Sequence, residues 1–301
     1  LIRHADQAMY QAKQAGKNRF HLFDVARDIA VKTQREETAR IRQGLQDGEF
    51  VLHYQPKVNM RTGAVIGAEA LIRWQHPERG LLAPAAFLPS IENHPICIDV
   101  GEWVIATALR QMAAWKAQGL DVPVSVNIDA MQLQKEGFSQ RLSQLLDQQP
   151  QVPARWLCLE ILETNALEDI ALVSDIMRRC QALGVRFALD DFGTGYSSLT
   201  YLKRLGAEEI KIDQSFVRDM LVDPDDLAIV QGVIGLAQAF HRDVVAEGVE
   251  TVEHGARLLP LGCHLAQGYG IARPMPAQDL AQWAAQWEPH PTWKAPPTDM
   301  A

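Results

Sequence analysis

Charged and amide side chains recur within, or at the end of, the strand-like apolar runs of this sequence. In chain order they are Glu69, Asn127, Glu160, Asp190, Asp191, Lys211, Glu247 and Gln267. Carboxylates directed into one small mouth would repel each other and raise their own pKa values unless cations neutralise them. Carboxylate and amide oxygens, without Cys or His, suit Mg²⁺ or Mn²⁺ better than Zn²⁺ or Cu²⁺. The pattern therefore predicts a site for hard divalent cations.

Two kinds of enzyme reaction use carboxylates gathered at one site. Glycoside hydrolysis needs only two and favours exposed aromatic residues, whereas this sequence has more acids and only Phe192, Tyr196 and Tyr269 near the expected mouth. Metal-assisted phosphodiester chemistry uses several carboxylates, two cations and a cationic side chain that offsets phosphate charge. Lys211 and Arg73 can supply that charge, so the second chemistry is favoured.

Each of these polar residues, taken alone, could instead cap a helix or bind a loop. The stretch from Asp190 to Ser198, with Gly193 and Gly195, could likewise be only a turn between a strand and a helix. Its position directly after an Asp-Asp pair favours a role in shaping the metal site. Seven consecutive strand ends with such residues favour a common site over separate caps.

The elements that must position these residues are strand-like runs alternating with helical ones. The runs are Phe50 to Val58, Ala64 to Trp74, Val122 to Ile128, Trp156 to Glu163, Arg186 to Phe192, Glu209 to Asp213, Asp243 to Val249, and Leu265 to Ile271. Helices are expected at 100–118, 167–183 and 225–240. The pattern predicts an α/β fold, a TIM-like (β/α)8 barrel, whose first strand is antiparallel to the second across the loop 59–63. An open doubly wound sheet is the alternative, although no G-x-G-x-x-G turn follows the early strands.

Composition narrows the class of protein further. The chain has 301 residues, 47% of them hydrophobic, and a formal net charge of −8, which disfavours binding to nucleic acid polymers. The four cysteines form no C-x-x-C pair, and no apolar run is long enough to span a membrane, so we expect a cytoplasmic protein without membrane contact from this segment. A polar connector helix is expected over 24–48, and the proline-rich tail 289–301 is expected to be flexible.

The sequence from about Thr38 to Trp287 resembles the EAL domain of cyclic di-GMP phosphodiesterases. The motifs that carry the resemblance are Glu69-Ala70-Leu71-Ile72-Arg73-Trp74, Val126-Asn127-Ile128, Leu159-Glu160-Ile161-Leu162-Glu163-Thr164, the loop Asp190 to Leu199, Lys211-Ile212-Asp213, Ala246-Glu247-Gly248-Val249-Glu250-Thr251 and Gln267-Gly268-Tyr269. Seven such motifs in the same order are specific, although each one alone is weak. The range 49–288 is assigned to this barrel.

The resemblance implies hydrolysis of cyclic di-GMP to linear pGpG with two Mg²⁺ or Mn²⁺ ions per active site. It implies that Glu69, Asn127, Glu160 and Asp190 bind one cation and that Asp190, Asp191 and Glu247 surround the other. It implies catalytic roles for Glu69, Lys211 and Glu247, with Lys211 holding the attacking water. Substrate contacts are implied for Gln55, Leu71, Arg73, Asp213, Glu250 and Tyr269, and supporting roles for Glu163, which braces the loop after Asp191, and Gln267.

Several further expectations follow from the same resemblance. The family commonly has Ser two residues after the asparagine, whereas this chain has Asp129, which adds a negative charge near the mouth. Residues 1–23 resemble the carboxyl end of a GGDEF diguanylate cyclase domain, so upstream GGDEF and sensory domains of the same chain are expected. A homodimer is expected through the helix that begins at Leu199, with Tyr201, Leu202 and Leu205 on it. A catalytically silent cyclic di-GMP receptor is the alternative function.

Overall fold

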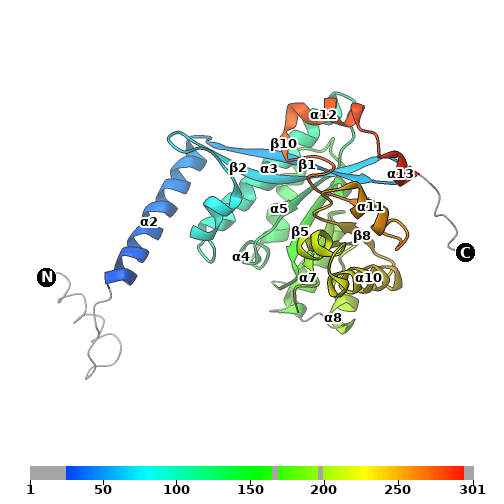
Figure 1. The fold of residues 1–301 in the computed structure, drawn as a ribbon. Coiled ribbons are helices and arrows are strands. Elements are labelled where there is room, and N and C mark those ends of the chain that lie inside the picture. The colour runs from blue at the N-terminus through cyan, green and yellow to red at the C-terminus, as the bar shows by residue number, and fades with distance from the viewer. Residues whose placement is uncertain (1–24, 165–168, 196–198, 295–301) are drawn as a thin grey trace, which may run out of the picture.

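Eight strands close into a barrel in this computed structural model, which describes residues 25–164, 169–195 and 199–294 (Figure 1). The barrel strands are β1 (Phe50–Asn59), β2 (Val65–His76), β4 (Val124–Asn127), β5 (Leu157–Leu162), β6 (Arg186–Phe192), β7 (Glu209–Ile212), β8 (Asp243–Ala246) and β9 (Leu265–Ala266). Neighbours from β2 to β9 are parallel, and β1 closes the ring between β9 and β2. The predicted fold class is confirmed.

Strand β1 is antiparallel to β2, as predicted from the short loop that joins them, and it is antiparallel to β9 as well. It pairs with β2 from Phe50 opposite Trp74 to Val58 opposite Val65. The side-chain oxygen of Asn59 accepts hydrogen bonds from the backbone N–H groups of Arg61 and Thr62, both at 3.0 Å, and this tightens the turn. The register places Gln55 opposite Glu69, so two predicted site residues face the barrel interior side by side.

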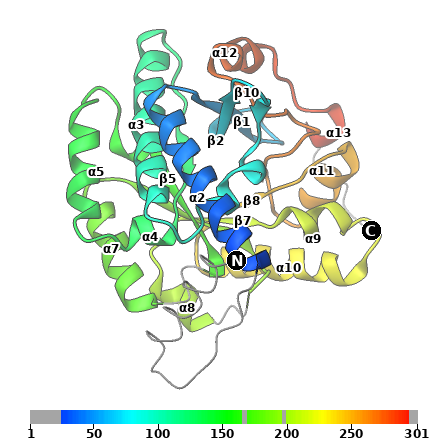
Figure 2. The same cartoon turned by 90° about the vertical axis from the view of Figure 1, so that its left-hand side faces the viewer.

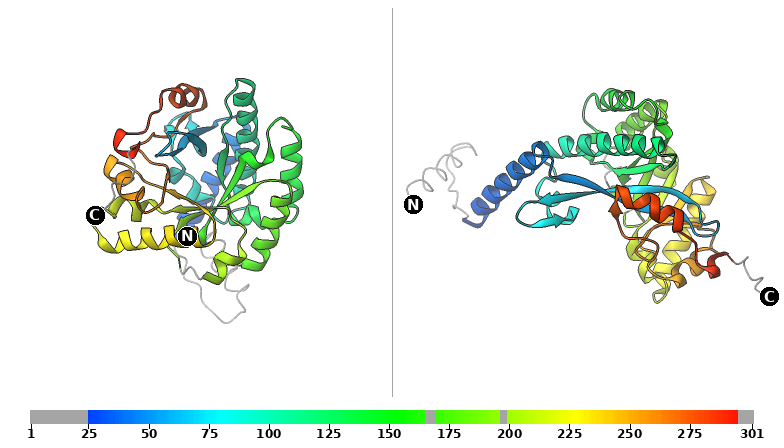
Figure 3. Two further views of the ribbon diagram at one scale, coloured as in Figure 1. Left: turned by 90° about the vertical axis from the view of Figure 1, so that its right-hand side faces the viewer. Right: turned by 90° about the horizontal axis from the view of Figure 1, so that it is seen from above.

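Helices coat the barrel between successive strands (Figures 2 and 3). They are α3 (Ile96–Ala117), α4 (Ala130–Leu133), α5 (Phe138–Asp147), α7 (Ile170–Ala182), α8 (Leu199–Arg204), α9 (Gln214–Asp219), α10 (Pro224–Ala239), α11 (Val252–Leu258) and α12 (Ala277–Gln286). Aspartates begin four of them, because each side chain accepts a hydrogen bond from a backbone N–H in the first turn. These caps are Asp129, Asp169, Asp213 and Asp223.

The core lies between the helical coat and the outer faces of the strands. Its largest members include Trp115 on α3, which meets Tyr54 on β1 edge to face with ring centroids 4.7 Å apart. Strand β6 shows the local cause: Phe187, Ala188 and Leu189 are all fully buried, as expected for a parallel strand covered on both faces. This packed core holds the strands in place, and so it determines where the site residues on them lie.

Helix α2 (Val25–Gln46) projects away from the barrel and joins it only near its end (Figure 1). Residues 32–37 are exposed, whereas Ile41 is buried. This helix covers the range for which a connector helix is expected. Two short strands, β3 (Gly80–Leu82) and β10 (Met275–Pro276), pair with the edges of β2 and β1 and were not expected from the sequence.

Some expected boundaries need correction. The eighth strand run was predicted from Leu265 to Ile271, but β9 ends at Ala266 because the following chain packs on the loop after β8. A Cβ atom on Gly268 would lie 2.3 Å from the backbone of Val249, so only glycine permits this approach. Strand β8 likewise ends at Ala246, just before Gly248 adopts φ +69°.

The expectation of a flexible tail from residue 289 is wrong for its first part. Pro291–Lys294 form α13, and Trp293 is buried against α11. Its Nε1 donates a 2.9 Å hydrogen bond to the carbonyl of Val252, and Gly255 leaves room for the indole ring. Burial of the large apolar ring of Trp293 orders this segment, although its prolines favour a chain without regular structure. Residues 295–301, and the residues 1–23 assigned to a GGDEF remnant, lie outside the described residues. Across 25–164, 169–195 and 199–294, each helix is too short or too polar to cross a bilayer.

Candidate active site

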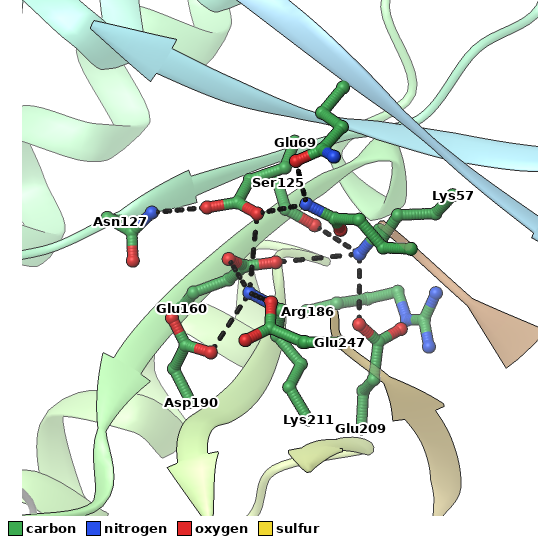
Figure 4. Close-up of polar contacts among 12 residues, drawn as sticks. Lys57, Glu69, Ser125, Asn127, Glu160, Arg186, Asp190, Glu209, Lys211 and Glu247 are labelled. Atoms are coloured by element: carbon green, nitrogen blue, oxygen red, sulfur yellow. Dashed lines mark hydrogen bonds and ion pairs between the residues drawn. The ribbon is translucent and has the colours of Figure 1, made fainter. Parts of the chain in front are cut away.

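Lys211 on β7 lies at the centre of the predicted residues (Figure 4). Its ammonium group contacts Oε2 of Glu160 at 2.7 Å, Oδ1 of Asp190 at 2.9 Å and Oε1 of Glu247 at 2.7 Å. A fourth carboxylate oxygen, Oε2 of Glu69, lies 3.5 Å away. Acids from β2, β5 and β6 and from the end of β8 therefore surround the buried ammonium group that β7 supplies.

Burial alone would favour the neutral form of Lys211, but the surrounding carboxylates favour the charged form. Desolvation lowers the pKa of Lys211, while the charges of Asp190, Glu160, Glu247 and Glu69 raise it by more, so the pKa lies well above its usual value. The lysine is therefore charged at neutral pH and holds the four carboxylates in place.

The carboxylates respond to the same environment in different ways. Burial raises the pKa values of Glu69, Asp190 and Glu247, and neighbouring acids raise them further against the effect of Lys211. Burial, Asp190 and Asp213 raise the pKa of Asp191 to about 7. In Glu160 the two lysines Lys211 and Lys57 outweigh burial and lower the pKa. The cluster therefore carries more acid than its lysine can neutralise.

Amide side chains hold Glu69 from both sides. Nδ2 of Asn127 donates to its Oε1 at 2.7 Å, and Nε2 of Gln267 donates to its Oε2 at 2.6 Å. Gln267 also donates to Gln55 at 3.0 Å, and Gln55 donates to the carbonyl of Ala272 at 2.9 Å. The buried Oε1 of Gln267 has no hydrogen-bond partner among the described residues, so an oxygen ligand remains available in the site.

Two groups of acids have the spacing of cation sites. Glu69, Glu160 and Asp190 form one group and Asp190, Asp191 and Glu247 the other, with ligand atoms in each group within 4.8 Å of one another. All the donors are carboxylate oxygens, which suit Mg²⁺ and Mn²⁺. The excess acid, the unpartnered oxygen of Gln267 and the shared Asp190 all fit a pair of bound divalent cations.

The loop after β6 is held by Glu163, which is fully buried. Its Oε2 accepts hydrogen bonds from the backbone N–H of Gly193 at 2.9 Å and of Gly195 at 3.4 Å. Asp191, near the end of β6 and just before this loop, adopts φ +52°, a strained conformation for a residue other than glycine. Glu163 thus fixes the backbone that aims Asp191 at the cluster. Residues 196–198 of this loop lie outside the described part.

The residues predicted for substrate contact lie around the cluster and differ in exposure. Tyr269 is 55% exposed, and the guanidinium of Arg273 lies 4.4 Å from its ring centroid. Arg73 is half-buried and donates to the carbonyl of Ile72 at 2.9 Å. A cavity of about 480 Å³ is lined by Leu71, Asn127, Ile128 and Leu162 together with several residues between Pro84 and Val104.

Two further predicted contacts, Asp213 and Glu250, lie at the edge of the cluster and outside it, respectively. Asp213 caps α9 by accepting from the backbone N–H of Ser215 at 2.8 Å, and it adjoins Asp191. Glu250 is exposed on the loop after β8.

With this geometry in place, comparison with known proteins decides the family. Residues 38–274 match the EAL domain family. The chain belongs to this family. The bifunctional diguanylate cyclase/cyclic di-GMP phosphodiesterase MucR of Pseudomonas aeruginosa is 41% identical over 281 residues, which cover 93% of this chain and 41% of MucR. The cyclic di-GMP phosphodiesterase PdeR of Escherichia coli is 38% identical over 283 residues, 94% of this chain and 42% of PdeR. This chain therefore spans less than half the length of either relative.

Solved structures of EAL proteins share the fold. The phosphodiesterase PaMucR in complex with c-di-GMP has a TM-score of 0.78 and 41% sequence identity, and the match covers 81% of this chain and 99% of that one. The cGMP-bound form of the EAL enzyme Bd1971 also has a TM-score of 0.78, with 33% identity over 85% of this chain and 71% of that one.

Asp129, the departure from the EAL pattern, does not add a free charge to the cluster. Its Oδ1 accepts from the backbone N–H of Met131 at 2.7 Å and from the thiol of Cys97 at 3.4 Å. The extra carboxylate is engaged as the N-cap of α4. The carboxylate of Asp129 therefore has a structural role at the start of α4.

Sequence reasoning missed a second buried polar group below Lys211. Lys57 on β1 contacts Glu209 and Ser125, and all three side chains point into the barrel. Burial lowers the pKa of Lys57, but Glu209 and Glu160 raise it by more, so Lys57 is charged. The signal lay in the alternation of strands, because Lys57 and Glu209 stand two residues from Gln55 and Lys211 and so share their face.

Proposed function

We propose that this EAL domain hydrolyses cyclic di-GMP to linear pGpG with two Mg²⁺ or Mn²⁺ ions. The observation that carries the proposal is the complete set of acids around Lys211, divided into two groups that share Asp190. The sequence similarity to MucR and PdeR, both named as cyclic di-GMP phosphodiesterases, supports it.

In this proposal Glu69, Asn127, Glu160 and Asp190 hold one cation, and Asp190, Asp191 and Glu247 hold the other. Bound cations supply charge that polarises the phosphate and lowers the pKa of a coordinated water. The chain itself orients the reactants. Lys211 has a fixed position among four carboxylates and would hold the attacking water, while Arg73 would bind the phosphate from the mouth.

The reaction adds one water to one phosphodiester. A bond forms between the water oxygen and phosphorus, the bond from phosphorus to the 3′ oxygen breaks, and the 3′ oxygen takes up a proton. The product keeps its other phosphodiester and is linear. Tyr269 and Leu71, at the mouth and the adjoining cavity, would contact the nucleoside groups.

The alternative is a receptor that binds cyclic di-GMP without hydrolysis. The intact acids of both groups favour the enzyme. Incubation of the chain with cyclic di-GMP and Mg²⁺ or Mn²⁺, followed by chromatography for pGpG, tests this directly. Product that appears with metal and stops with excess EDTA is expected. Tight binding of cyclic di-GMP with no pGpG in either metal would establish the receptor.

We also propose that the longer protein acts in second-messenger signalling in the cytoplasm as a homodimer with upstream GGDEF and sensory domains. Two residues expected at the dimer contact, Leu202 and Leu205, are each 1% exposed and pack in the core of their own domain. Exposed apolar side chains after β7 include Leu221 and Val222, in the turn between α9 and α10, and Ile229 on α10. Sedimentation at micromolar concentration tests the dimer.

A further inference from the structure

A second buried lysine lies directly beneath the catalytic cluster. Nζ of Lys57 is 2.6 Å from Oγ of Ser125, 2.9 Å from Oε1 of Glu209 and 3.5 Å from Oε1 of Glu160. Its side chain is 6% exposed, and those of Glu209 and Glu160 are 5% and 0% exposed. In Figure 4 the ammonium group of Lys57 and the carboxylate of Glu209 lie to the right of the ammonium group of Lys211 and its partners.

The barrel thus contains two stacked polar layers, each with one lysine. Side chains two residues apart on a strand point to the same face, so Gln55 and Lys57 on β1, and Lys211 and Glu209 on β7, contribute to successive layers. Glu160 belongs to both. Its Oε2 contacts Lys211 at 2.7 Å and its Oε1 faces Lys57 at 3.5 Å.

Packing alone does not account for the lower layer. Burying a lysine and a glutamate costs desolvation energy that their attraction rarely exceeds, and apolar residues of similar volume often fill such a place equally well. Because Glu209 balances the charge of Lys57, the pair changes the net charge of the barrel interior little. What it does supply is a donor fixed in position on one oxygen of Glu160.

We infer that Lys57 is a positioning residue that holds the Glu160 carboxylate in the orientation needed to bind a divalent cation. The inference rests on the proposed metal-dependent function. Glu209 and Ser125 in turn hold Lys57, so the lower layer acts on the cation only through Glu160. Groups that orient metal ligands in this way typically change metal affinity about 10- to 100-fold when removed.

The test uses the double variant K57M/E209Q, which removes one positive and one negative charge and so keeps the net charge of the full chain. Mn²⁺ binding is measured by calorimetry, alongside circular dichroism and thermal unfolding. We expect Mn²⁺ to bind about 10- to 100-fold more weakly in a folded variant. The matched control E209Q, which keeps Lys57 on Glu160, should lose less than about threefold. Wild-type Mn²⁺ affinity in the folded double variant would overturn the inference.

A second variant covers the case in which K57M/E209Q fails to fold. Lys57 lines a cavity of about 290 Å³ at the base of the barrel, together with Ser125, Arg155 and Arg186. In K57A, ethylammonium ions that enter through this cavity should restore Mn²⁺ affinity, whereas ethanol should not. Absence of rescue in folded K57A, or loss of the fold in both variants, would assign Lys57 to stability alone and overturn the inference.

These outcomes are separate from the proposed function. A wild-type chain that binds Mn²⁺ but releases no pGpG contradicts the enzyme and leaves the Mn²⁺ measurement valid. A chain that hydrolyses cyclic di-GMP equally well with and without Lys57 contradicts only the positioning role.

Discussion

The guanidinium of Arg40 on α2 lies over the indole ring of Trp74 on β2, 5.2 Å from its centroid. Both side chains also donate hydrogen bonds to the carboxylate of Glu49. The guanidinium of Arg40 reaches Oε1 at 2.8 Å and Oε2 at 2.7 Å, and Nε1 of Trp74 reaches Oε2 at 2.8 Å. Trp74 follows Arg73 on the strand that carries Glu69. The projecting helix is therefore attached to the strand that supplies the first acid of the site.

Replacing Arg40 by Ala should loosen the end of α2 without changing the barrel. Part-exposed ion pairs contribute little, so we expect amide hydrogen exchange in 40–46 to rise about two- to fivefold. Hydrolysis should stay within about twofold, because Arg40 touches no site residue. The exposed Arg35 on the same helix provides the control R35A. Equal exchange in R40A and wild type would show that the Arg40 contacts do not anchor α2.

Replacing Glu69 by Ala should abolish hydrolysis while the fold survives. Glu69 is a ligand of the proposed cation site, and its burial among acids raises its pKa, so its removal relieves repulsion in the cluster. Chromatography should show turnover reduced more than about 100-fold, since even residues behind a ligand account for that much. The exposed Glu136 gives the control E136A. Near wild-type turnover in E69A with unchanged circular dichroism would exclude Glu69 as a ligand.

The sequence predicted the barrel and the convergence of the acids well, because both depend on local patterns. Strand β6 was predicted with its observed bounds, since a run of buried apolar residues ends at an Asp-Asp pair. The acids expected on the barrel strands, Glu69, Glu160, Asp190, Asp191 and Glu247, all lie in the cluster. The parallel strands all end at the same edge of the barrel, so position along a strand was enough.

The features that the sequence did not predict depend on contacts between residues far apart in the chain. The two-residue strand β10 forms because β1 extends beyond its pairing with β9 and offers a free edge at His53 and Tyr54. The three-residue strand β3 pairs with β2 in the same way. Trp293 is buried because Gly255, far from it in the chain, leaves space. The pairing of Lys57 with Glu209 joins residues 152 apart. Aspartates at the mouth were ambiguous for the same reason, since cap and ligand have the same residue type and differ only in what lies opposite.

Calcium should replace magnesium poorly. Ca²⁺ is larger, takes roughly 6 to 8 oxygen ligands and tolerates irregular geometry, whereas the acid groups here are tightly spaced around a shared Asp190. We expect Ca²⁺ to support binding of cyclic di-GMP while pGpG formation falls to background. Binding by calorimetry and product by chromatography are measured in each metal. Equal rates in Ca²⁺ and Mg²⁺ would argue against a pair of closely spaced cation sites.

Glu163 should affect turnover through the loop that it holds. Replacing it by Ala removes the acceptor for the N–H groups of Gly193 and Gly195, so Asp191 loses its fixed backbone. We expect kcat to fall about 10- to 100-fold in E163A and less in E163Q, which keeps one acceptor oxygen. Hydrogen exchange at 191–195 should rise in the same order. A fall in kcat without faster exchange in the loop would show that Glu163 acts in another way.

Tyr269 should contribute to substrate affinity through its ring. The side chain is 55% exposed at the mouth, yet Arg273 holds one face of the ring at 4.4 Å, which leaves an ordered aromatic surface toward solvent. Stacking of a base on such a ring is worth about 1–3 kcal/mol, so Y269A should raise KM for cyclic di-GMP on the order of tenfold with kcat little changed. Y269F keeps the ring and should behave like the wild type. R273A should fall between the two, because the ring remains but is held less firmly. Steady-state kinetics of the three variants decide the point: an equal rise in KM for Y269F and Y269A would assign the contact to the hydroxyl instead of the ring.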